Sequence, residues 1–216
     1  MKTLALSIIL LDASMLYAAV PTEIFPFPGS DYFPNGLVQG TNGNFYGTMH
    51  QNGQLGYGAI FELCTNGTVI NLFVFSGTNG ANPKSRLTLG TDGNFYGVTQ
   101  TGGASGDGTV FQMTPSGQFT NLCQFSSSSG SYPFGELMQG MDGGFYGTTE
   151  SANNVGTVFR VTSSGAVTTV ATFTSVNGNT PWAGLVQDKA VIFMARRNMA
   201  VSAIWGAFSV SPPMVF

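Results

Sequence analysis

Charged side chains are scarce in this sequence. They make up 8% of the 216 residues, and the formal net charge is −3. A chain with so few cations offers no basic face that could follow a phosphate backbone. We therefore predict that nucleic acid is not a partner.

Histidine and cysteine are nearly missing as well. The chain has one histidine, His50, and two cysteines, Cys64 and Cys123, without Cys-x-x-Cys spacing. These residues do not make a zinc site. We predict that both cysteines are small buried hydrophobes, with a disulfide between neighbouring repeats as the alternative. No metal site and no cofactor are predicted.

The apolar run at the N-terminus is too short to cross a membrane. Leu4–Leu11 has the length of a signal-peptide core, Met1-Lys2 supplies a positive charge before it, and Ala18-Ala19 offers small residues for cleavage. We predict that residues 1–19 are a signal peptide and that the protein is secreted or displayed at the cell surface. The alternative is an apolar leader left from a truncated upstream repeat.

Glycine and aromatic residues are abundant instead, and they recur with a fixed period. Phe-Tyr-Gly begins at Phe45, Phe95 and Phe145, which are 50 residues apart. Around each copy lie the same turn and strand signals: the tight turns Asn42-Gly43, Asp92-Gly93 and Asp142-Gly143, the strands Gly58–Phe61, Gly108–Phe111 and Gly156–Phe159, and the second turns Asn66-Gly67, Ser116-Gly117 and Ser164-Gly165. Asn-Gly and Asp-Gly tolerate the positive φ that two-residue hairpins require. Each unit therefore reads as four short antiparallel strands.

Four strands in a unit of about 40–50 residues are typical of a β-propeller blade. Helical solenoids are excluded because the sequence has no 3.6-residue period. We predict an all-β, β-propeller-like array of four-stranded antiparallel blades, incomplete or open. The predicted repeat region is 20–184, divided into an incoming fourth strand with its linker at 22–36 and three blades at 37–86, 87–136 and 137–184.

A fourth copy of the repeat starts at Leu185-Val186-Gln187, after which the pattern breaks down. Ile192–Ala200 can be encoded so that reading from the third base gives Phe-Tyr-Gly-Thr-Thr-Gln-His-Gly. We therefore hypothesise that residues 185–216 are a degenerate or frameshifted fourth repeat, caused by a one-base deletion that the coding DNA would reveal. The alternative is a genuine C-terminal strand pair or a short apolar anchor. As written, these residues should be poorly specified and leave open sheet edges through which the chain could self-associate.

The repeat resembles a known family. Gly90-Thr91-Asp92-Gly93-Asn94-Phe95-Tyr96-Gly97, with the later Gly-Thr-Val-Phe and the closing Leu-x-x-Phe, is similar to the GloVer tandem repeat of bacterial choice-of-anchor proteins. The resemblance covers residues 22–187, with departures at Asn42, Val98 and Gly144. It implies an exported, propeller-like surface protein whose members often carry a C-terminal sorting anchor, although no anchor is legible here. The family brings no established catalytic residues.

The long, variable loops all fall on one face of the predicted blades, and function is expected there. The candidate site residues on that face are His50, Tyr57, Asp107, Tyr132, Glu136 and Glu150. His50 lacks an accompanying serine or cysteine motif, which favours a solvated loop residue over a general base. Asp92 and Asp142 lack the spacing of a calcium loop and are explained by turn chemistry.

Two functions fit these observations. The first is a non-catalytic surface propeller that binds protein or glycan, or serves as a scaffold, through the long-loop face. The Phe-Tyr pairs belong first to the core because their place in the repeat is fixed, so Tyr57 and Tyr132 are the better candidates for exposed aromatics. The alternative is a carbohydrate-active propeller enzyme in which two of Asp107, Glu136 and Glu150 form a carboxylate pair.

Overall fold

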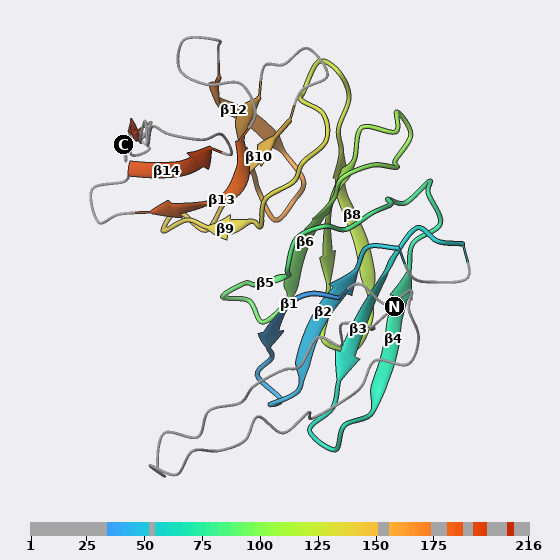
Figure 1. The fold of residues 1–216 in the computed structure, drawn as a ribbon. Helices are drawn as coiled ribbons and strands as arrows, with labels where there is room; N and C mark the ends of the chain where they lie inside the picture. Colours follow the sequence, from blue (N-terminus) through green and yellow to red (C-terminus); the bar gives the residue numbers. More distant parts are fainter. Residues whose placement is uncertain are drawn as a thin grey trace, which may run out of the picture.

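The computed structural model of the protein describes residues 34–51, 55–150, 156–173, 181–187, 192–197 and 207–209. These residues form β-strands and no helix, arranged in three four-stranded antiparallel sheets and one three-stranded sheet (Figure 1). The predicted all-β array of four-stranded blades, open rather than closed, is confirmed. The predicted signal peptide, 1–19, and the predicted incoming strand, Thr22–Phe25, lie outside the described residues.

Each complete blade is a meander of four strands in chain order. Blade 1 contains β1 (Pro34–Gln39), β2 (Phe45–Met49), β3 (Ala59–Leu63) and β4 (Val69–Val74). Blade 2 contains β5 (Thr88–Leu89), β6 (Phe95–Thr99), β7 (Thr109–Met113) and β8 (Phe119–Gln124). Blade 3 contains β9 (Met138–Gln139), β10 (Phe145–Thr149), β11 (Thr157–Val161) and β12 (Val167–Thr172).

Three further strands continue the repeat after blade 3. They are β13 (Pro181–Gln187), β14 (Ile192–Arg197) and β15 (Ala207–Ser209), paired in the order β13-β14-β15. The register of β13 with β14 pairs Gln187 with Phe193, as Gln39 pairs with Phe45 in blade 1. These residues therefore form a strand pair, β13 with β14, which agrees with the alternative of a genuine strand pair. The one-base deletion stays a prediction for the coding DNA to test.

The third and fourth strands of every complete blade share an irregularity that the sequence does not suggest. The pairing shifts by one residue after Ile60, Val110 and Val158, which leaves an extra residue in the fourth strand. In blade 1 this β-bulge turns both Leu72 and Phe73 toward the same apolar cluster, whereas a regular strand would point them to opposite faces. The bulge thus adds apolar contact with the next blade.

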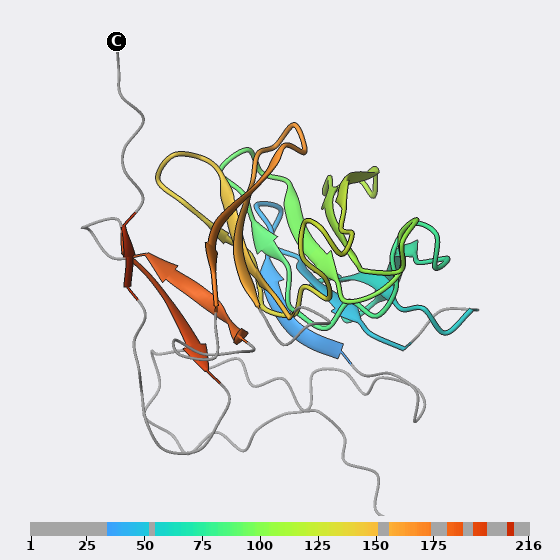
Figure 2. The same cartoon turned by 90° about the horizontal axis from the view of Figure 1, so that it is seen from above.

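Successive blades pack face to face, and these junctions form the core. Tyr46 and Ile60 of blade 1 belong to one buried cluster with Phe95 and Phe111 of blade 2. Phe-Tyr-Gly supplies both sides of the contact between complete blades, because Tyr46 meets Phe95 and Tyr96 meets Phe145. Figure 2 shows the sheets following one another in chain order, from blade 1 in blue and cyan to the last sheet in red. All three tyrosines, together with Phe95 and Phe145, are fully buried, which confirms the predicted core position of the Phe-Tyr pairs except at Phe45, which is half-buried.

A buried tyrosine must satisfy its hydroxyl group, and each blade does so with one carboxylate. Tyr96 donates a hydrogen bond to Asp92 (2.7 Å) and accepts one from Gln112 (2.7 Å). In blade 1 the turn residue is Asn42 and the carboxylate has moved to the third strand, where Glu62 accepts from Tyr46 (2.9 Å). In blade 3, Asp142 accepts from Tyr146 (3.0 Å) and from Arg160 (2.7 Å). Asp92 and Asp142 also accept backbone N–H groups within their turns, which agrees with the predicted turn role.

These clusters shift the pKa values of their members. Burial, followed by the hydrogen bond to Asp92, raises the pKa of Tyr96 to about 12. Burial raises the pKa of Asp142, but the hydrogen bonds from Arg160 and Tyr146 outweigh it and the net pKa is lowered. The phenol of Tyr96 therefore holds its proton more tightly than in the unfolded chain. The carboxyl group of Asp142 holds its proton more weakly than in the unfolded chain.

We expect the protein to lose stability as the pH rises from about 10 to about 12. The folded pKa of Tyr96 lies above the unfolded value of 10.0, so its contribution is complete below pH 10 and disappears as the pH passes the folded pKa. Denaturant unfolding measured across this pH range checks the expectation. Tyr96→Phe should make the decline shallower, and an unchanged decline would contradict the role assigned to this hydroxyl.

Both cysteines are free thiols, so the alternative of a disulfide between repeats is not realised. Cys64 and Cys123 are each half-buried rather than fully enclosed. Burial raises the pKa of the Cys123 thiol to about 11, despite a backbone hydrogen bond with Val110 that lowers it. A thiol with so high a pKa is a poor nucleophile at neutral pH.

Candidate functional site

The long loops and the linkers between blades form one surface, which we call the loop face. At the first junction, the linker residue Asn82 has a left-handed backbone (φ 53°). Its N–H donates to the carbonyl of Tyr57 in the blade 1 loop (2.8 Å), and its carbonyl accepts from the N–H of Gln100 in blade 2 (3.0 Å). The linker therefore joins the loops of two blades through its backbone.

The second junction repeats this geometry with three of the predicted site residues. Tyr132 has φ 56°, its N–H donates to the carbonyl of Asp107 (2.8 Å), and its carbonyl accepts from the N–H of Glu150 (3.1 Å). Left-handed backbone is uncommon for a bulky residue and much more favourable for asparagine. The blade 2–blade 3 junction thus holds a strained tyrosine where the preceding junction has Asn82.

The structure brings together some of the predicted site residues and separates others. Asp107, Tyr132 and Glu150 meet at the second junction, whereas Tyr57 belongs to the first. His50 follows β2 in blade 1, at the repeat position that Glu150 occupies in blade 3. Glu136 is not part of this set, because it forms an ion pair in an inner groove.

Tyr57 is the exposed aromatic of the loop face. It is 40% exposed, which confirms its predicted accessibility, while Tyr132 is half-buried. A Cβ placed on Gly77 would lie 3.3 Å from Tyr57 Cζ and 3.5 Å from Cε1 and Cε2. The ring therefore rests against the bare α-carbon of Gly77, which limits its motion. The result is an accessible aromatic with a defined position.

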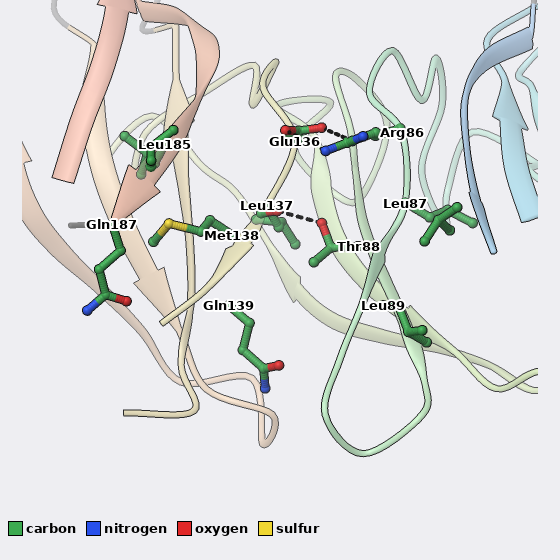
Figure 3. Close-up of a pocket in the computed structure, with 12 residues that line it drawn as sticks. Arg86, Leu87, Thr88, Leu89, Glu136, Leu137, Met138, Gln139, Leu185 and Gln187 are labelled. Atoms are coloured by element: carbon green, nitrogen blue, oxygen red, sulfur yellow. Dashed lines mark hydrogen bonds and ion pairs between the residues drawn. The ribbon is translucent and has the colours of Figure 1, made fainter. Parts of the chain in front are cut away.

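An inner groove lies along the first strands of the blades (Figure 3). Its volume is about 710 Å³, and it is lined by β1, β5, β9 and β13 together with the residues just before them. Met138 and Val186 give it an apolar middle, and Gln139 and Gln187 stand at the end near the tight turns. The sequence did not single out this groove.

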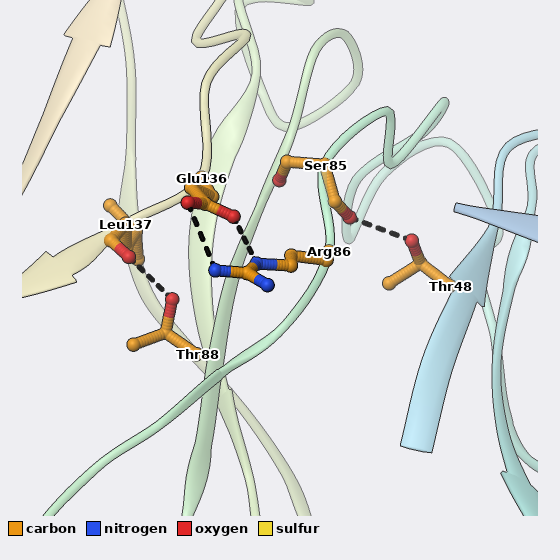
Figure 4. Close-up of polar contacts among 6 residues, drawn as sticks. All are labelled: Thr48, Ser85, Arg86, Thr88, Glu136 and Leu137. Carbon is orange, nitrogen blue, oxygen red and sulfur yellow. Dashed lines mark hydrogen bonds and ion pairs between the residues drawn. The ribbon is translucent and has the colours of Figure 1, made fainter. Parts of the chain in front are cut away.

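Glu136 and Arg86 form an ion pair at the end of the groove nearest the loop face (Figure 4). The side chains are 34% and 56% exposed, so the pair is well solvated and contributes little stability. Next to it, Thr88 donates a hydrogen bond to the carbonyl of Leu137, and Thr48 donates to the carbonyl of Ser85 (2.8 Å). The two threonine hydrogen bonds link neighbouring blades. The carboxylate of Glu136 is neutralised by Arg86.

No three His, Cys, Asp or Glu side chains come together as metal ligands among the described residues. The same part of the chain contains no helix that is long and apolar enough to cross a membrane.

The fifty-residue unit also matches a known sequence family. Residues 18–200 match the model of the Gloeobacter/Verrucomicrobia repeat. The chain belongs to this family. The resemblance to the GloVer repeat is therefore confirmed. None of the curated proteins matches this Gloeobacter/Verrucomicrobia repeat protein.

Solved structures show the same fold at low sequence identity. A streptogramin B lyase structure aligns with a TM-score of 0.56 at 18% identity, over 87% of this chain and 58% of that one. A putative gluconolactonase aligns with 0.52 at 18%, over 79% and 59% of the two chains, and a gluconolactonase from Xanthomonas campestris with 0.55 at 16%, over 77% and 56%. The repeat protein spans less than two thirds of each of these chains. The likeness establishes a propeller-like fold and nothing about activity.

Proposed function

We propose that this repeat protein is an exported, non-catalytic glycan-binding module, and that Tyr57 and Tyr132 on the loop face contact the sugar. The observation that carries the proposal is the Tyr57 ring, which is exposed and held against Gly77. Sugars present C–H groups that pack on an aromatic face, while their hydroxyls need neutral hydrogen-bonding partners. A ring that is already ordered loses little entropy on binding.

The surroundings of Tyr57 suit a neutral ligand. The nearby linker carries Ser76, Thr78, Asn79 and Asn82, and the chain as a whole has few charges. Tyr132 supports sugar binding as well. It is an aromatic residue in a left-handed backbone conformation that asparagine adopts more easily, so the strained position is occupied by a side chain able to stack on a sugar. Two aromatics at consecutive junctions offer two points of contact on the same face.

Replacing Tyr57 with alanine is expected to weaken glycan binding by about tenfold, which corresponds to about 1.4 kcal/mol of lost stacking. Tyr57→Phe keeps the ring and should bind almost as well. A glycan array with the full chain would identify the ligand, and calorimetric titration would give the affinities of the variants.

Two further variants complete the test of the loop face. Tyr132→Asn reproduces the residue of the preceding junction and should weaken binding without disturbing the fold. Met141→Ala changes a residue that is 83% exposed in a tight turn, on the other face, and should bind normally. Binding that survives Tyr57→Ala and Tyr132→Asn, or binding of protein ligands alone, would refute the proposal.

A carbohydrate-active enzyme is the second candidate, and one observation favours it. Asp107 and Glu150 are held at the same junction by the backbone of Tyr132. Glycoside hydrolysis uses two carboxylates on opposite sides of the scissile bond. Sugar turnover that Asp107→Asn and Glu150→Gln abolish while leaving binding intact would establish the enzyme in place of the binding module.

Export rests on the N-terminal pattern of a positive charge, a short apolar run and small residues. If residues 1–19 are removed on export, the mature chain begins at Val20. N-terminal sequencing of the exported protein checks this, and an intact Met1 on that protein would contradict the signal-peptide prediction.

A further inference from the structure

Two cationic side chains stand together at the end of the inner groove nearest the loop face. Burial alternates along the segment that leads into β5: Pro83, Ser85 and Leu87 are buried, whereas Lys84 and Arg86 are exposed. Alternate residues of an extended chain point to the same side. Lys84 and Arg86 therefore share the side of the segment that faces away from the core, and Arg86 lines the groove (Figure 3).

The segment that leads into blade 3 places one aromatic ring and one carboxylate next to these cations. Nζ of Lys84 lies 5.8 Å from the centre of the Phe134 ring. Arg86 donates to Glu136 through Nε and through Nη2 (3.2 Å to Oε1), and its third nitrogen, Nη1, lies outside the pair (Figure 4). Lys84 makes no ion pair with a carboxylate that the structure describes. Because Glu136 neutralises Arg86, the charge of Lys84 remains at this end of the groove, together with the N–H groups of Nη1.

Two glycines confine the ion pair from either side. The repeat position that carries Arg86 and Glu136 carries Gly36 in β1 and Gly184 in β13. A Cβ on Gly36 would lie 3.3 Å from Cβ of Arg86, and a Cβ on Gly184 would lie 2.7 Å from Cγ of Glu136. The stems of both charged side chains therefore rest against bare α-carbons, which limits the directions in which the pair can turn.

Beyond the ion pair, blades 2 and 3 line the groove with apolar surface and with polar groups that already have partners. The hydroxyl of Thr88 donates to the carbonyl of Leu137, and the side-chain amide of Gln139 is bonded to the N–H (2.9 Å) and the hydroxyl (3.2 Å) of Thr91. Met138 lines the groove next to them. The groove volume of about 710 Å³ is within the range of about 300–1,000 Å³ that is usual for small-molecule sites. A hydrocarbon group suits this part of the groove better than a sugar.

We propose that the inner groove binds a small carboxylic acid with a hydrocarbon body, and that the carboxylate lies between Lys84 and Arg86 while the body packs on Met138. The negative headgroup complements the charge of Lys84, and it accepts charge-assisted hydrogen bonds from Nζ of Lys84 and Nη1 of Arg86. Each methylene of the body that leaves water strengthens binding about fourfold. The site includes neither tyrosine of the loop face and is independent of glycan binding.

Calorimetric titration of the full chain with octanoate tests this site, with octanol as the neutral ligand of the same chain length. Octanoate is expected to bind about tenfold more tightly than octanol, and its affinity should fall as salt is added, because the two cations are solvated. Hexanoate, which has two methylenes fewer, should bind about tenfold more weakly than octanoate. No binding of octanoate, or equal affinities for octanoate and octanol, would overturn the proposal.

Variants of the chain separate the contribution of the charge from that of the apolar contact. Lys84→Gln should weaken octanoate binding about fivefold to tenfold, whereas Lys84→Arg keeps the charge and should bind within about twofold of the wild type. Met138→Gln should weaken the binding of octanoate and octanol alike. Ile70→Thr is the control, because Ile70 is 43% exposed on the outer strand β4, and it should leave both affinities unchanged. A Lys84→Gln chain that is folded by circular dichroism and binds octanoate as tightly as the wild type would contradict the position assigned to the carboxylate.

Discussion

Replacing Phe111 with alanine is expected to lower the free energy of unfolding by about 3–5 kcal/mol. Phe111 is fully buried, and its ring contacts those of Phe75 in blade 1 (5.5 Å) and Phe119 in its own blade (5.5 Å). The loss combines the transfer of the ring to water with the cavity left at a junction between two blades. The stacked sheets leave the backbone little freedom to collapse into this cavity.

Denaturant unfolding measures the effect of Phe111→Ala, with Ile70→Ala as the control. Ile70 is exposed on an outer strand, so its replacement should cost less than about 1 kcal/mol. A loss below about 1 kcal/mol for Phe111→Ala would mean that the blade junction is not packed as described.

Gly108→Ala is expected to destabilise the protein by more than about 3 kcal/mol, as the sum of backbone strain and overpacking. Gly108 has φ 98°, and an added Cβ would lie 2.4 Å from the carbonyl oxygen of Thr99 and 2.7 Å from Pro133 Cδ. The surrounding backbone cannot move away easily, because the carbonyl of Gly108 accepts from the N–H of Phe125 (2.9 Å). The substitution would therefore disturb both the loop face and the fourth strand.

Gly93→Ala separates the two contributions to this loss. Gly93 has φ 80°, but a Cβ there would have no atom within 4 Å. It should cost only the backbone strain of about 1–2 kcal/mol. Equal losses for Gly93→Ala and Gly108→Ala would contradict the close packing of Gly108 against Thr99 and the linker residue Pro133.

The blades could be predicted because their signals are local and repeated. Asn42-Gly43 indicated a turn with positive φ, and Gly43 has φ 86°. The fourth-strand bulge could not be predicted, since Leu72 and Phe73 face the same cluster and so break the alternation from which strand faces are inferred. Both residues are apolar, so their side-chain chemistry is compatible with a regular strand and with a bulged one. Packing against the next blade decides between the two.

The functional surface could be predicted less well than the fold. The loop face followed from loop lengths, but the meeting of Asp107, Tyr132 and Glu150 depends on backbone bonds across a junction. The ion pair of Arg86 and Glu136 does have a signal in the sequence, because the two opposite charges occupy the same position of consecutive repeats, 50 residues apart. Neighbouring repeats bring equivalent positions together, so charge reversal at one repeat position is a usable sign of contact.

A second signal of contact is the position of the acidic residue that accepts from the buried tyrosine, which lies in the turn in some repeats and in the third strand in another. Asn42 is accompanied by Glu62, and Asp92 by Gln112, so the acid moves while the tyrosine keeps its acceptor. The compensation is visible in the sequence only when whole repeats are compared, because it joins positions 20 residues apart.

The account depends most on the tyrosine–phenylalanine contact that recurs at both junctions between complete blades. A double-mutant cycle of Tyr96→Leu and Phe145→Leu measures that contact directly, with Tyr46→Leu and Phe145→Leu as the control pair, because Tyr46 and Phe145 lie two blades apart. The rings of Tyr96 and Phe145 are 3.8 Å apart with an interplanar angle of 25°, so a coupling energy of about 0.5–1.5 kcal/mol is expected. The control pair should show a coupling below about 0.5 kcal/mol. A coupling between Tyr96 and Phe145 no larger than that of the control would contradict the order of blades described for this protein.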